Sequence, residues 1–247
     1  MARSPSGESV LTRAVRILDA FTPDEPALPV SVIARRSGLP VATASRLIAE
    51  LVGHGLLARE PDRRIRVGVR LWELGQRASP TLGLREAAMP FLADLHDVVG
   101  HHIQLGVLEG DEVLFVERLS APGAVINYTR IAGRLPLHAS SSGLVLLAHS
   151  PGELQERVLA APLARYTANT ITDPGRLRGT LAGIRRDGYV LCAGHIHPEA
   201  TGIAVPVRSD TQVVAAVAAI VPNDEHARAA VPALRAAARG IGRLLSH

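Results

Sequence analysis

The sequence predicts an α+β protein in two parts, because the spacing of its apolar residues changes along the chain. Up to about residue 99, apolar residues recur at every third or fourth position, which is typical of amphipathic helices. From His101 onward, several segments alternate apolar residues with others, which is typical of strands. With 247 residues, 47% of them hydrophobic, the chain can form two domains with a core in each. We expect a helical first part, and a second part in which a mixed sheet is flanked by helices.

The first part is predicted to contain three helices. The first runs from Ser9, which can cap it, to about Phe21, and the others span 30–37 and about 41–54. Gly38 can adopt the left-handed conformation that ends a helix, and Pro40 can open the next one. The expected inward faces are Leu11, Ala14, Val15 and Leu18 in the first helix, Val30, Ile33, Ala34 and Ser37 in the second, and Ala44, Leu47, Ile48 and Leu51 in the third.

A basic hairpin follows the third helix. Two short strands, over 56–59 and 65–67, surround the turn Glu60-Pro61-Asp62-Arg63-Arg64. Three helices, two of them joined by a short Gly-containing turn, together with this hairpin predict a winged helix-turn-helix over residues 1–70. Two linking helices, over 71–78 and 84–99, make residues 71–99 a linker.

Residues 100–247 are predicted as the second domain. Its alternating segments predict strands over 101–108, 112–118, 124–131, 189–194, 201–208 and 213–221. Helices are predicted over 141–149, 151–160, 174–187 and about 224–245. The last helix places Val231, Leu234, Ala238, Ile241 and Leu245 on one side.

The excess positive charge of the chain lies in its first third. Residues 1–77 contain 12 Arg and 8 acidic residues, whereas residues 78–247 contain 15 of each, and the chain has no Lys. This charge asymmetry indicates that the N-terminal part binds a polyanion such as a nucleic acid. The alternative is that an excess of four charges has no functional meaning.

Composition excludes several classes of chemistry. The single cysteine, Cys192, excludes an internal disulfide and any multi-cysteine zinc or iron–sulfur site. Without Lys, the chain has no GxxxxGK[ST] phosphate loop, no pyridoxal Schiff base and no SxxK pair. We therefore expect no cofactor.

Neither an export signal nor a membrane span is expected. The start of the chain is polar, and the longest uncharged stretch, 135–152, contains four Ser, two His and two Pro. The expectation is a soluble, cytoplasmic protein without a membrane partner.

Five short motifs occur in a characteristic order. They are Ala34–Pro40 leading into Arg46-Leu47, Val67–Gly75, Leu135–Ser140 with Gly143, Thr170–Thr172 with Arg185–Tyr189, and Gly202–Val207. In this order and spacing they make the chain resemble the IclR family of bacterial transcriptional regulators over nearly its whole length. Three positions depart from the usual family pattern: Pro29 replaces a Ser/Thr cap, Leu144 replaces a Lys, and Gly194-His195 replaces an acidic pair.

The resemblance implies a function. It implies an N-terminal domain that binds double-stranded DNA, a C-terminal GAF-like domain that binds a small-molecule effector, and a dimer or tetramer. Two-fold symmetry then predicts a pseudo-palindromic operator. The linking helices carry the exposed-looking Leu71, Trp72, Leu74 and Leu84, which we expect to form the dimer surface.

The third helix is the predicted recognition helix, since its N-terminal half would enter the major groove. The residues expected to face DNA bases are Val41, Ala42, Thr43, Ser45 and Arg46. The residues expected to contact phosphates or the minor groove are Arg35, Arg36, Arg63, Arg64 and Arg66. The alternative for both sets is a solvated basic face.

The helix that begins after Ser140 offers an anion site, because backbone N–H groups are unpaired at a helix start. The resemblance places the carboxylate of an effector at Ser141 and Ser142; ordinary serine capping is the alternative. The other expected effector contacts are Leu135, Leu137, Cys192, Gly202, Ala218 and Ile220. Because these positions are mostly apolar or small, we expect a dry pocket and a small organic acid with an apolar or aromatic body.

An enzyme is the competing hypothesis. Cys192, His195 and His197 form a Cys-x-x-His-x-His cluster, which would need a bend at Gly194 to converge. A metal site would need a further ligand, which His101, His102 or His138 could supply. The chain has no GxSxG or HExxH motif, so we expect no catalytic residues and no metal site. Sequence-specific DNA binding would distinguish a regulator from an enzyme with an N-terminal interaction domain.

Overall fold

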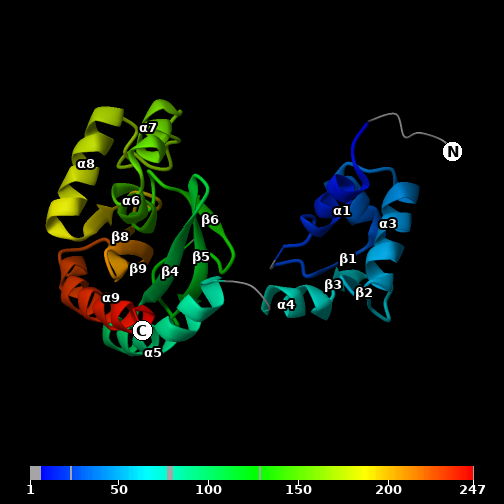
Figure 1. Cartoon of the computed structure of the whole chain (residues 1–247), viewed down its shortest axis with the longest axis horizontal. Helices are drawn as coiled ribbons and strands as arrows, with labels where there is room; N and C mark the ends of the chain where they lie inside the picture. Colours follow the sequence, from blue (N-terminus) through cyan, green and yellow to red (C-terminus); the bar gives the residue numbers. More distant parts are fainter. Residues whose placement is uncertain (1–6, 23, 77–79, 128, 247) are drawn as a thin grey trace. The chain divides into compact units, whose positions relative to one another are not determined.

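The computed structural model describes residues 7–22, 24–76, 80–127 and 129–246, which form two compact units (Figure 1). The first unit spans residues 1–79 and the second residues 80–247. Helix α4 (Val69–Gln76) belongs to the first unit and helix α5 (Pro80–Val99) to the second. The two helices predicted as a separate linker are therefore divided between the units.

The first unit contains the predicted three helices and hairpin. The helices are α1 (Val10–Leu18), α2 (Val30–Ser37) and α3 (Val41–Gly53). The hairpin strands β2 (Leu57–Arg59) and β3 (Ile65–Val67) are joined by β1 (Ala27–Leu28), a strand that the sequence pattern did not predict, in an antiparallel sheet of order β1-β3-β2. The core includes Ile17, Ile33, Leu47, Ile48, Leu57 and Ile65.

The predicted inward face of α1 is half right, because Ala14 and Leu18 pack against the core but Leu11 and Val15 are exposed. Ser9 caps the helix as expected, accepting a hydrogen bond from Thr12 N at 3.0 Å. However, Ile17 is the apolar residue of α1 that is fully buried, whereas Leu11 is 73% exposed. Apolar residues occupy two sides of this helix, so periodicity alone could not determine which side meets the core.

The turn between α2 and α3 forms as predicted. Gly38 has φ of +61°, and Leu39 N donates to Ala34 O at 3.0 Å, which closes the end of α2. Arg16 of α1 also donates to Ser37 O in the last turn of α2. These contacts fix the turn that leads from α2 into α3.

The second unit is built on a six-stranded sheet of order β6-β5-β4-β9-β8-β7. Its strands are β4 (His102–Glu109), β5 (Glu112–Leu119), β6 (Arg134–Pro136), β7 (Val190–Ala193), β8 (Ala200–Ser209) and β9 (Gln212–Pro222). All pairings among these described strands are antiparallel. The sequence predicted a mixed sheet, with both parallel and antiparallel pairs, and this prediction is wrong. No strand forms over the described residues of 124–131; they belong to a loop, and β6 follows it instead.

Helices cover both faces of this sheet (Figure 1). On one face, α6 (Ser141–Ala148), α7 (Gly152–Ala160) and α8 (Pro174–Asp187) bury one apolar core. On the other face, α5 and α9 (Val231–Leu245) bury a second core. The short 3-10 helix η1 (Ala227–Ala230) directly precedes α9. Leu84 is only 7% exposed and belongs to this second core, so it cannot serve as the predicted dimer contact in this arrangement.

The predicted last helix begins later than expected. Pro232 lies in the first turn of α9, where a backbone N–H would have no partner within the helix, so its absence there costs no hydrogen bond. The residues before α9 form η1. Within the described part of the chain, no helix is both long and apolar enough to cross a membrane.

Helix α9 approaches strand β8 closely at Gly242. A Cβ atom at this position would lie 2.2 Å from Arg208 O, a backbone atom that cannot move aside. Gly179 of α8, in contrast, has no atom within 4 Å of such a Cβ. The two glycines therefore offer a matched test of this packing.

We expect Gly242→Ala to lower the free energy of unfolding by about 1–3 kcal/mol, because the added methyl group forces α9 away from β8. Gly179→Ala should raise it by about 0.5–1 kcal/mol, because alanine favours the helical conformation. Urea denaturation followed by circular dichroism measures both changes. A stabilising effect of Gly242→Ala would contradict the close approach.

Candidate functional site

The solvent-facing side of α3 carries the residues predicted to read DNA bases. Val41, Ala42, Ser45 and Arg46 are exposed, and Thr43 is half-buried. The opposite side of the helix is held in the core of the first unit. Arg46 Nη1 lies 3.5 Å from Glu50 Oε1, and both side chains are more than half exposed. Such a surface ion pair contributes little stability, so the Arg46 guanidinium remains available to another anion.

The two arginines at the end of α2 differ in their contacts. Arg35 is exposed and has no ion-pair partner among the described residues. Arg36 donates to Ala20 O at 3.0 Å and pairs with Glu25. Arg36 therefore helps to hold its own domain together, a role that the sequence pattern did not reveal.

The three predicted arginines of the hairpin are exposed at its tip and on β3. Arg63 has φ of +68° at the tip and no ion-pair partner among the described residues. Arg64 lies 3.7 Å from Asp62, and Arg66 pairs with Glu60. Of these three arginines, Arg63 is therefore the most available to bind a phosphate.

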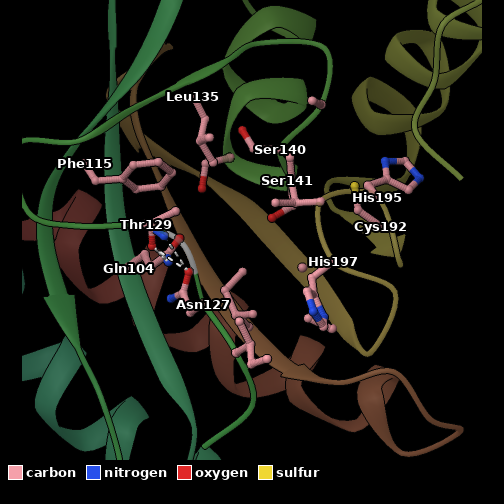
Figure 2. Close-up of a pocket in the computed structure, with 17 residues that line it drawn as sticks. Gln104, Phe115, Asn127, Thr129, Leu135, Ser140, Ser141, Cys192, His195 and His197 are labelled. Atoms are coloured by element: carbon pink, nitrogen blue, oxygen red, sulfur yellow. Dashed lines mark hydrogen bonds between the residues drawn. The ribbon is translucent and has the colours of Figure 1, made fainter. Parts of the chain in front are cut away.

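A cavity lies in the second unit between the sheet and the first turn of α6 (Figure 2). The space among its lining residues is about 480 Å³, a figure that includes the part open to solvent. The loop over 120–133 and the loop over 194–199 contribute to its walls. Its larger apolar lining residues are Phe115, Ile126, Leu135, Ile196 and Ile220.

The first turn of α6 supplies unpaired donors to the cavity. Ser140 Oγ accepts a hydrogen bond from Gly143 N at 3.0 Å, so it caps the helix. The backbone N–H groups of Ser141 and Ser142 donate no hydrogen bond to another described residue, and the Ser142 hydroxyl is buried without a partner. Free N–H groups at a helix start favour an anion.

A second polar group lies across the cavity from His195 (Figure 2). Gln104 on β4 donates to Thr129 Oγ1, and Thr129 Oγ1 donates to Asn127 Oδ1 at 2.8 Å. These bonds use the oxygen of the Asn127 side chain but leave its amide nitrogen buried and unpartnered. Because a buried polar atom without a partner is costly, this nitrogen indicates a ligand or water in the cavity.

The third unpartnered polar atom of the cavity is His195 Nδ1. Burial, and then the nearby charge of Arg176, hold the pKa of His195 below its usual value, so the ring is neutral at neutral pH. Thr170 Oγ1 donates to His195 O at 2.7 Å and fixes this loop. No Arg, Asp or Glu belongs to the described lining of the cavity.

Comparison with known proteins assigns both parts of the chain. The model for the IclR helix-turn-helix domain matches residues 10–61, and the model for the C-terminal part of the bacterial transcriptional regulator IclR matches residues 76–247. The chain belongs to the IclR family. It is therefore a DNA-binding transcriptional regulator with an effector-binding second domain.

Individual IclR-family relatives cover most of the chain. HTH-type transcriptional regulator XynR of Escherichia coli is 31% identical over 208 residues, which are 83% of this chain and 82% of XynR. BhcR of Paracoccus denitrificans is 32% identical over 208 residues, which are 83% of this chain and 74% of BhcR. The crystal structure of an IclR homolog from Microbacterium hydrocarbonoxydans, complexed with 4-hydroxybenzoate, is 49% identical, with a TM-score of 0.93. That match covers 96% of this chain and 99% of the homolog.

The structure brings most, but not all, of the predicted effector contacts together. Those that line the cavity are Leu135, Ser141, Ser142, Cys192, Gly202 and Ile220. Leu137 and Ala218 are buried in the adjoining apolar core and are absent from the cavity lining.

The sequence predicts a dry pocket, whereas the cavity also has a polar lining. Gln104, Asn127, Thr129, His195 and His197 all line the cavity. Gln104 could have been noticed, because it interrupts the apolar residues of a strand that is buried on both faces. Asn127 and Thr129 lie in the loop that was predicted to be a strand, so their side chains could not be placed.

The enzyme hypothesis gains no geometric support. Burial raises the pKa of the Cys192 thiol to about 12, so it is not a thiolate at neutral pH. Among the described residues, no group of three His, Cys, Asp or Glu side chains could hold a metal ion. Of the three candidate further ligands, two contact backbone carbonyls: His102 Nε2 lies 2.6 Å from Val125 O, and His138 Nε2 lies 2.9 Å from Ala164 O. The third, His101, has a buried Nδ1 without a hydrogen-bond partner, but it belongs to no group of three potential ligands among the described residues.

Proposed function

We propose that this IclR-family regulator responds to a small aromatic carboxylic acid with a polar group opposite its carboxylate, of which 4-hydroxybenzoate is an example. The observation that carries the proposal is that unpaired donors at α6 and a second polar group line the same cavity. The 49% identical homolog that is complexed with 4-hydroxybenzoate supports the same ligand class.

In this proposal the carboxylate binds at the first turn of α6. The N–H groups of Ser141 and Ser142 and the Ser142 hydroxyl donate to it, so that no cationic side chain is required. The aromatic body lies against Phe115, Leu135 and Ile220. A hydroxyl group at the other end would accept a hydrogen bond from the Asn127 amide nitrogen.

Ser142→Ala should weaken the binding of 4-hydroxybenzoate by about tenfold, which corresponds to about 1.4 kcal/mol. Because the Ser142 hydroxyl has no hydrogen bond in the protein, this change should not lower the stability of the unliganded protein. Titration calorimetry measures the affinity, and urea denaturation measures the stability.

Ser150→Ala is the matched control. Ser150 Oγ donates to Leu147 O at 2.8 Å near the other end of α6, away from the cavity lining, so its loss should not change ligand affinity. The alcohol 4-hydroxybenzyl alcohol, which lacks the carboxylate, should bind much more weakly than 4-hydroxybenzoate. Tighter binding of a short aliphatic hydroxy acid would contradict an aromatic effector.

We further propose that α3 reads the operator and that the hairpin positions the domain on the DNA backbone. Arg46→Ala should remove about 1–3 kcal/mol of discrimination between an operator, selected from a random duplex pool, and unrelated DNA. Arg63→Ala should instead weaken binding to both duplexes alike and flatten the salt dependence. Fluorescence anisotropy over a range of salt concentrations measures both effects. An unchanged specificity ratio in Arg46→Ala would refute the recognition-helix assignment.

We also propose that the protein is a homo-oligomer on a pseudo-palindromic operator and has no catalytic activity. The first unit leaves large apolar side chains uncovered, including Trp72, which is 64% exposed on α4, and Leu74, which is 41% exposed. Leu71 of α4 is half-buried. Contact between two copies through this helix would cover them and would double the DNA surface that is read.

Trp72→Ala should weaken self-association and, in parallel, operator binding. Light scattering at micromolar protein concentrations measures the mass. Val98→Ala, which removes an apolar side chain of α5 that is 74% exposed, is the control and should leave the mass unchanged. A wild-type mass equal to one chain of 26.1 kDa, with full operator affinity, would refute the proposal.

A further inference from the structure

Four arginines gather in an open groove of the second unit, on the side of α9 that faces the end of β8. The arginine groove is defined here as Arg208, Arg235, Arg239 and Arg243, all of them exposed. Helix α9 is the red helix in Figure 1, packed beside α5. This surface lies outside both the effector cavity and the helix-turn-helix.

The groove is built by helix periodicity and by one glycine. Arg235, Arg239 and Arg243 are spaced four residues apart, so they lie on the same side of α9 at intervals of about 6 Å. Gly242 lets α9 approach the backbone of Arg208, which adds the fourth guanidinium beside this row. The packing thus fixes the positions from which the arginines project.

The positive charge of the groove is poorly compensated within the protein. Arg208, Arg239 and Arg243 have no ion-pair partner among the described residues. Arg235 donates to Asp187 O and stacks 5.2 Å from the Tyr189 ring centre. Asp210 is the acidic residue of the described groove lining, and the Asp187 carboxylate, which pairs with Arg186, also lies near Arg235. The four groove cations therefore outnumber the carboxylates beside them.

This arrangement does not stabilise the helix. Like charges four residues apart on a helix repel, and the lining offers no large aromatic side chain that could anchor a protein partner. Residues 78–247 contain as many acidic residues as Arg, so the clustering is local and invisible in the net charge. A row of guanidinium groups without acidic partners is suited to a row of phosphates. Each guanidinium can donate two hydrogen bonds to one phosphate.

We propose that the arginine groove binds the phosphate backbone of duplex DNA that flanks the operator, while the helix-turn-helix reads the operator itself. The inference rests on the DNA-binding function of the first unit. Because both units belong to one chain, operator binding holds the groove at a high effective concentration of the flanking duplex. The effector-binding domain then contributes salt-dependent, sequence-independent affinity to the complex.

The test compares two duplexes, the selected operator alone and the same operator extended by about 15 base pairs of fixed random sequence on each side. The wild-type protein should bind the extended duplex more tightly and with a steeper salt dependence. The double variant Arg239→Ala/Arg243→Ala should lose most of this advantage. Its slope of log affinity against log salt on the extended duplex should become shallower by about two units for each bound chain, while its affinity for the operator alone stays unchanged.

The matched control is the double variant Arg157→Ala/Arg178→Ala. It removes two exposed arginines of the same unit that are already paired, with Asp111 and Glu156, and it should behave as wild type. Calorimetry with 4-hydroxybenzoate checks that the groove variant keeps its effector domain folded.

Three results would overturn the proposal. The first is equal wild-type binding to both duplexes. The second is an equal loss on both duplexes in the groove variant. The third is a change of mass by light scattering in that variant, which would assign the groove to contact between copies of the chain. Failure of sequence-specific binding to the operator alone would instead refute the DNA-binding function on which the inference rests.

Discussion

The contact between α6 and the sheet is the constraint on which the second unit depends. All eight residues of this helix are buried, and its first turn approaches the strands at two glycines. A Cβ at Gly202 would lie 2.8 Å from Ser141 Oγ, and one at Gly106 would lie 3.5 Å from Ser142 Cβ. Because these strands carry no side chain there, the start of α6 reaches the sheet, and the cavity forms beside its unpaired N–H groups.

The cavity combines three unpartnered polar atoms with a lining that has no charged side chain among its described residues. Those atoms, Ser142 Oγ, Asn127 Nδ2 and His195 Nδ1, have no hydrogen-bond partner within the protein, and burying a polar atom is costly unless a ligand or water pairs with it. A ligand that satisfies them recovers this cost and stabilises the folded form by mass action. Selectivity would then arise from hydrogen-bond geometry and the helix dipole rather than from a salt bridge.

Position decides what each arginine can do in this lysine-free chain. Arg36 is tied to the interior of its own domain, Arg46 stands on the exposed face of α3, and Arg243 lies in an open groove. Net charge located the basic excess in the first unit but could not show that a unit of balanced charge carries a basic surface of its own. The number of arginines is a property of the sequence, whereas their availability depends on which acids the fold brings near.

The sequence by itself determined the two-part architecture, the helix-turn-helix and most helices and strands, because apolar periodicity and the Gly38 turn are local signals. It also indicated the start of α6 and six residues of the cavity lining, through motifs on regular elements. It could not determine the buried side of α1, the loop over 120–133 or the polar lining that this loop and Gln104 provide. Those features depend on contacts between segments far apart in sequence, such as Gln104 with Thr129, and only tertiary packing creates such contacts.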